Sequence, residues 1–143
     1  GVSSAESVVR PSMELLSVEP LLGRPSDVHY VAREATAEGA QRDDLIIVSA
    51  FESHALYVFV PTSQGARPVA RIELDSRTED GTGVGRGPFA VEVVERNGRN
   101  LVFVANFFDH SVTVFDFTAE NPSDFKQVAK VQNETIETSD SSF

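Results

Sequence analysis

Residues 103–117 read FVANFFDHSVTVFDF, two short apolar runs separated by Phe108, Asp109 and His110. Residues 101–104 are all apolar, although successive side chains of a strand point to opposite faces. This pattern predicts a strand that is buried on both faces, and the Asp-His pair predicts a tight turn into a second strand. The stretch therefore indicates an antiparallel hairpin packed between two other layers.

The hairpin has a second copy upstream. Residues 45–60, LIIVSAFESHALYVFV, align with it when His54 is placed on His110, a constant offset of 56 residues (54 to 110). Similar stretches flank both copies: GRPSDVHYV resembles GRGPFAVEVV before them, and PVARIEL resembles QVAKVQ after them. Self-similarity at this spacing in short strands predicts a repeated β-sheet unit.

Each copy reads as four strands, and four-stranded antiparallel sheets repeated radially are the blades of a β-propeller. The expected fold is therefore all-β, a propeller segment of two four-stranded antiparallel blades. The strands are expected at residues 26–32, 44–51, 55–61 and 67–74, and again at 89–95, 100–107, 111–117 and 125–132. The expected organisation is an N-terminal segment at 1–22, blades at 23–84 and 85–132, and an acidic polar tail at 133–143.

The second copy resembles the YVTN-type propeller repeat over residues 85–131. The similarity lies in a strand that ends in Val-Ala-Asn, a short polar turn, and then Ser-Val-Thr-Val and an Asp. In the first copy, Ala50 stands at the position of the motif's Asn and Val60 at that of its Asp. The resemblance implies a propeller of a secreted, periplasmic or cell-surface protein, and it names no catalytic residue.

A propeller closes with about 4–8 blades, and this chain supplies two. Residues 13–19, MELLSVE, predict one more outer strand that belongs to a neighbouring blade. Two blades alone would leave large apolar faces in water, which marks an interface. We therefore expect another protein chain, the remainder of the same gene product after cleavage, or copies of this chain to complete the ring. The alternative is that the two sheets pack as a self-sufficient sandwich. Because the chain starts at Gly1 without Met, we also expect that an upstream segment was removed.

The repeat also predicts which residues form the core. Apolar positions in the two central strands of each copy are expected to be almost fully buried. These are Leu45, Ile47, Val48, Val58, Leu101, Phe103, Val104, Val112 and Val114.

The composition excludes several classes of protein. The chain has 12 Lys and Arg against 22 Asp and Glu, a net charge of −10, which repels nucleic-acid phosphates and anionic lipid. It has no Cys, so a disulfide, a thiolate metal site and a cysteine nucleophile are excluded. No apolar run approaches the ~20 residues that a membrane-spanning helix needs.

The candidate chemical motifs are weak. His54 and His110 lie in equivalent turns, but no third metal ligand stands beside them. The stretch Gly81–Gly87 lacks the Lys-Ser/Thr of a phosphate-binding loop, and Asp75, Glu79 and Asp80 lack calcium-loop spacing. We therefore expect no cofactor, no metal and no catalytic residue.

Two functions remain. The first is a non-catalytic scaffold that presents a rigid face of loops to a protein partner within a larger complex. The alternative is a propeller segment of a multi-chain enzyme, because YVTN-type propellers resemble quinoprotein dehydrogenase-like and lactonase-like proteins. The candidate partner-facing residues are Phe51, Glu52, His54, Phe107, Phe108, Asp109 and His110, and the candidate channel-facing residues are Asp27, His29 and Glu92.

Overall fold

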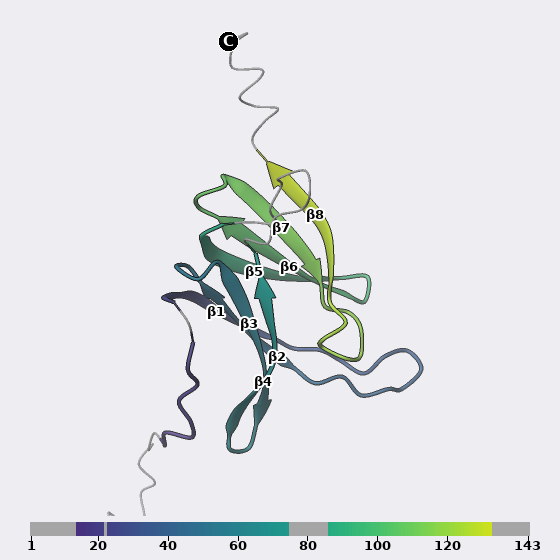
Figure 1. Cartoon of the computed structure of the whole chain (residues 1–143). Coiled ribbons are helices and arrows are strands. Elements are labelled where there is room, and N and C mark those ends of the chain that lie inside the picture. Colours follow the sequence, from purple (N-terminus) through teal and green to yellow (C-terminus); the bar gives the residue numbers. More distant parts are fainter. Residues whose placement is uncertain (1–13, 22, 75–85, 133–143) are drawn as a thin grey trace, which may run out of the picture.

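The structure is a computed structural model that describes residues 14–21, 23–74 and 86–132. These residues form two four-stranded antiparallel sheets in sequence order and no helix, so none of them forms a helix long enough to cross a membrane. The all-β prediction with two such sheets is confirmed (Figure 1). The first sheet consists of β1 (Pro25–Val31), β2 (Leu45–Ala50), β3 (Ala55–Thr62) and β4 (Gly65–Glu73). The second consists of β5 (Pro88–Arg96), β6 (Arg99–Asn106), β7 (Ser111–Asp116) and β8 (Lys126–Gln132).

The two sheets repeat each other residue by residue. His29 lies opposite Ile47 in the first sheet, and Glu92 lies opposite Phe103, the residue at the 56-position offset, in the second. Register shifts also fall at equivalent places, at the start of β1 and β5 and within the β3–β4 and β7–β8 pairings. The sequence repeat is therefore a repeat of strand pairing, bulges included.

One face of each sheet, which we call the forward face, contains Ile47 in the first sheet and Phe103 in the second; the opposite face is the rear face. The forward face of the first sheet packs on the rear face of the second and forms the main core. Its members include Leu45, Ile47 and Val58 from the first sheet and Val102, Val104 and Phe115 from the second.

The core prediction is correct for one part of its residues and wrong for the other. Leu45, Ile47, Val58, Val104 and Val114 are buried, as expected. Four others are only partly buried, and all four lie on the two faces that point away from the main core: Val48 on the rear of the first sheet, and Leu101, Phe103 and Val112 on the forward face of the second. Val114 lies on that forward face too, opposite Phe103, and is buried there. The prediction that the 101–104 strand is buried on both faces is thus wrong for this chain alone.

The segment that precedes β1 lies against the first sheet. Leu21 packs on a small cluster on the rear face of that sheet, which includes Tyr57 and Phe59. Ser17 lies so close to Gly65 that a Cβ atom on Gly65 would clash with the Ser17 Oγ atom. The N-terminal segment therefore crosses the rear side of the first sheet near β4.

The expected extra strand is not formed within the chain. Residues 14–19 belong to no strand, and residue 13 lies outside the described residues. A strand needs a ladder partner, and the side chains of Leu15, Leu16 and Val18 are exposed. Pairing with a strand of another chain stays a prediction.

The outer strands β4 and β8 each pair on one side only. Both contain basic residues of an otherwise acidic chain, Arg67 and Arg71 in β4 and Lys126 and Lys130 in β8. Pro68 adds a residue without an amide hydrogen to β4.

Candidate interaction face

Two equivalent turns lie at one end of the sheets. The turn between β2 and β3 ends at His54, with φ at 51°, and the turn between β6 and β7 ends at His110, with φ at 50°. Residues other than glycine rarely adopt this left-handed conformation. The two turns therefore have the same backbone conformation at their histidines.

His54 connects the first sheet to the second. Its Nδ1 atom accepts a hydrogen bond from the backbone N–H of Gly87, at 2.9 Å, in the connection that leads into β5. Gly87 has φ at 66°, and a Cβ atom there would lie 2.5 Å from the Cδ2 atom of Phe108. The backbone conformation therefore favours glycine, and a Cβ atom at this position would force the ring of Phe108 to move.

Four phenylalanines gather over this connection, and we call them the phenylalanine cluster: Phe51, Phe89, Phe107 and Phe108. The ring of Phe51 lies at its centre, with centroid distances of 6.4 Å to Phe89, 6.1 Å to Phe107 and 5.1 Å to Phe108. The other three side chains are each more than half exposed. A contiguous apolar surface of this kind marks a site of interaction.

A shallow cavity of about 260 Å³ opens beside the cluster. It lies between Phe51 and Phe89 and is lined by Arg24, Pro25 and Ser26. At its rim, Arg24 pairs with Glu52, with 3.2 Å between Nη2 and Oε1. The cluster thus has the composition of a protein-docking surface, with an aromatic centre and a charged rim.

The structure brings together most of the residues that we predicted to face a partner. Phe51, His54, Phe107 and Phe108 contact one another, and Glu52 lies at the rim of the cavity. Two others lie elsewhere on the same turn. Asp109 pairs with Lys130, at 3.6 Å, and the His110 side chain is exposed.

Phe89 is not among the residues predicted to face a partner, because in the sequence it is the first residue of an expected strand. The register shift between Pro88 and Ala90 takes Phe89 out of the regular pairing of β5 with β6. A Phe directly after Gly-Pro at the start of a repeat is the signal that could have found it.

Of the three predicted channel-facing residues, Asp27 and His29 lie together, and Glu92 occupies in the second sheet the position that His29 occupies in the first. The Oδ2 atom of Asp27 accepts the backbone N–H of Val91, at 2.8 Å, and lies 3.6 Å from the Nε2 atom of His29. Asp27 therefore connects the inner strands of the two sheets. His29 and Glu92 occupy the same register position in successive sheets, so they point in the same direction and not toward each other.

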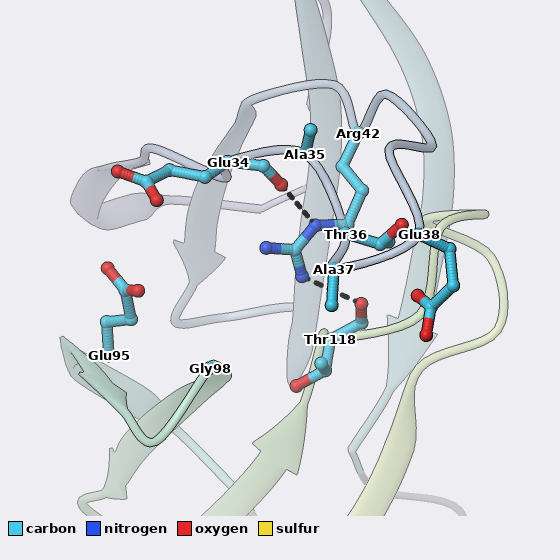
Figure 2. Close-up of a pocket in the computed structure, with 9 residues that line it drawn as sticks. All are labelled: Glu34, Ala35, Thr36, Ala37, Glu38, Arg42, Glu95, Gly98 and Thr118. Atoms are coloured by element: carbon cyan, nitrogen blue, oxygen red, sulfur yellow. Dashed lines mark hydrogen bonds between the residues drawn. The ribbon is translucent and has the colours of Figure 1, made fainter.

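A second cavity, of about 350 Å³, lies at the opposite end of the sheets (Figure 2). Its wall contains Glu34, Glu38 and Glu95 together with Arg42. The guanidinium of Arg42 is already engaged: Nε donates to the Glu34 carbonyl at 2.5 Å, and Nη1 donates to the Thr118 carbonyl at 3.0 Å and to Asn100 Oδ1 at 3.2 Å. This cavity is therefore the gap beneath a loop that is fastened to the second sheet.

Arg33, which is buried, also connects this loop to the second sheet. Its Nη1 atom donates to the carbonyls of Phe117, at 3.0 Å, and Ala119, at 2.7 Å, while Nε donates to the Asp43 carbonyl at 2.6 Å. Burial lowers the pKa of Arg33 from its ordinary value, and the charge of Arg42 adds to the effect. The long connection between β1 and β2 is thus held beside the connection between β7 and β8 (Figure 1).

Asp116, the last residue of β7, forms hydrogen bonds with β6 and with the connection that follows β7. Its Oδ2 atom lies 2.9 Å from Nη2 of Arg99, and its Oδ1 atom accepts hydrogen bonds from the hydroxyl and the backbone N–H of Thr118. Burial by itself raises the pKa of this carboxyl. The hydrogen bonds from Thr118 and Arg99 outweigh burial, so the pKa of Asp116 lies below its ordinary value.

The described residues contain no group of three or more His, Asp or Glu side chains placed to hold a metal ion. Asp75, Glu79, Asp80 and most of the glycine-rich stretch lie outside the described residues. No protein-family model matches the chain, and no curated protein matches its sequence.

Proposed function

We propose that the chain is a non-catalytic protein-interaction and assembly module, whose phenylalanine cluster docks an apolar segment of a protein partner. The observation that carries the proposal is the exposure of three phenylalanine rings, two on the turn between β6 and β7 and one at the start of β5. Interfaces are enriched in aromatic residues at their centres, because a ring buries 150–250 Å² and has few rotatable bonds to immobilise.

Rigidity supports the proposal as much as exposure does. Phe51 packs against the other rings, and His54 holds Gly87 beneath Phe108. A surface that is already ordered loses little conformational entropy when a partner binds, so more of the buried area contributes to affinity.

We further propose that the module is a segment of a β-propeller and acts outside the cytoplasm. The two repeated sheets support the propeller, as does the resemblance of residues 85–131 to the YVTN-type repeat. The extracytoplasmic location is proposed from that resemblance alone.

The experiment identifies a partner by photo-crosslinking and then measures its affinity. A photoreactive phenylalanine analogue at position 107 is used in cells that produce the protein, and the crosslinked partner is purified for titration calorimetry. The Phe107→Ser and Phe89→Ser variants should each weaken binding by at least about 10-fold, since central aromatic residues dominate interface energies.

The matched control is Tyr30→Ser, which removes another exposed aromatic ring, on β1 and outside the cluster. It should bind the partner like the natural chain. Equal affinity of the natural chain and both phenylalanine variants would refute the proposed docking role of the cluster.

A further inference from the structure

The forward face of the second sheet is exposed at positions whose counterparts in the first sheet are buried. Val31 is 1% exposed, whereas its counterpart Val94 is 38% exposed. Ile72 is 6% exposed, whereas its counterpart Val131 is 62% exposed. The counterparts follow from the strand registers, because Val31 pairs opposite Leu45 and Val94 opposite Leu101.

What covers these positions in the first sheet is known: it is the rear face of a sheet of the same repeat. Val102, Val104 and Phe115 of the second sheet supply that cover. The exposed forward face therefore has a template for its missing neighbour within the same molecule. A third sheet with a similar rear face would contact Leu101, Phe103 and Val131 as the second sheet contacts Leu45, Ile47 and Ile72.

The two histidine turns point to the same neighbour. His54 accepts the backbone N–H of Gly87, which precedes the sheet that packs on the first forward face. His110 has the same left-handed backbone conformation at the equivalent turn, and its side chain is exposed. A third sheet would bring an equivalent backbone N–H to the ring of His110.

Two arrangements of copies of this chain fit the surface poorly. A head-to-tail copy would have to dock the rear face of its first sheet, where Leu21 already packs. A face-to-face copy centred on Phe103 would bring two Glu92 carboxylates together, because Glu92 lies directly opposite Phe103. Like charges at a desolvated contact are costly.

We infer that the forward face of the second sheet is the docking site for a third four-stranded sheet of the same repeat type, in addition to the two sheets of the described residues. That sheet presents a β-branched and aromatic rear face, and the connection before it donates a backbone N–H to His110. The inference extends the proposed assembly function and rests on it, but it concerns a surface other than the phenylalanine cluster.

The first test extends the chain without removing any part of it. A second copy of residues 75–132 is inserted after Gln132, so that a tethered third sheet offers the rear face of the second. Methyl NMR with a soluble paramagnetic chelate measures the exposure of Val94 and Val131. We expect the relaxation enhancement at both methyl positions to fall at least threefold; a folded third repeat without any fall would overturn the inference.

Two variants assign the contact in the extended chain. Val131→Lys in the second sheet should restore the relaxation enhancement at Val94. His110→Ala should raise the rate of amide hydrogen exchange in the third sheet at least 10-fold. In the natural chain, His110→Ala should leave the free energy of unfolding in urea unchanged, whereas His54→Ala should lower it. If His110→Ala has no effect in the extended chain, the role of His110 is refuted.

The second test distinguishes a third sheet of the same repeat type from a second copy of this chain. Light scattering of the natural chain at concentrations from about 5 to about 500 μM, a range that would reveal weak dimers, should report a monomer. A dimer that Val131→Lys dissociates would overturn the inference in favour of a second copy. A failure of the proposed function would be seen in a different measurement, the affinity of the Phe107→Ser and Phe89→Ser variants for the crosslinked partner.

Discussion

Replacing Arg33 by Ala should destabilise the whole chain, although Arg33 lies in a connection between strands. The side chain is buried, and its guanidinium donates to carbonyls on both sides of the sheet interface. The substitution removes these hydrogen bonds and leaves the carbonyls of Phe117 and Ala119 without this donor.

The expected loss of unfolding free energy is about 2–4 kcal/mol. Each hydrogen bond to a charged group contributes about 1.5–3 kcal/mol, and Arg33 makes three that are 3.0 Å or shorter. The release of the ordered side chain offsets about 2 kcal/mol of that sum, and water that enters the opened site offsets more. Arg33→Lys should lose about half as much, since an ammonium lacks the planar fork that reaches both sides.

Urea unfolding followed by far-ultraviolet circular dichroism measures the loss, provided that the slope with denaturant is unchanged. Arg42→Ala is the matched control, because Arg42 belongs to the same loop but is only partly buried. We expect about 1 kcal/mol for it. A loss below about 1 kcal/mol for Arg33→Ala, or equal losses for the two variants, would contradict the reasoning.

Three more predictions follow from the same structure. Phe103→Ala should cost the isolated chain only about 1–2 kcal/mol in urea unfolding, because Phe103 is partly buried and a fully buried Phe costs about 3–5 kcal/mol; the full cost would show that its face is covered in solution. Gly87→Ala should cost about 1–2 kcal/mol and displace the ring of Phe108, seen as shifted ring resonances in NMR; unchanged resonances would contradict the contact. The lowered pKa of Asp116 means that its stabilisation is present above the pKa of the unfolded chain and is lost as pH falls through the folded value. The unfolding free energy should therefore fall below about pH 4 in the natural chain and fall less in Asp116→Asn; identical slopes would contradict this.

The strand repeat was predictable because apolar residues at fixed offsets leave few alternatives to paired sheets. The alignment of His54 with His110 predicted the equivalent turns, and the structure shows the same conformation in both. The extent of burial was not predictable in the same way, since a sequence such as residues 101–104 shows that both faces of the strand are apolar and not whether both are covered.

Other features were missed because their sequence signals are ordinary. Arg33 lies in a charged loop that reads as solvated, and only the tertiary fold places carbonyls around it. Phe89 reads as one more strand residue, and the role of His54 depends on a backbone N–H that lies 33 residues further along the chain. Contacts between side chains and distant backbone leave no periodic pattern to read.

The charged outer strands have a consequence for how the molecule behaves when it is concentrated. Strands at the edge of a sheet can template the addition of further strands from other molecules, which leads to fibres. Here β4 carries Pro68, Arg67 and Arg71, β8 carries Lys126 and Lys130, and both strands pair across a register shift. Two such edges that approach each other bring like charges and irregular ladders together. The fold thus leaves its faces available for specific neighbours, while its edges at β4 and β8 resist indiscriminate growth.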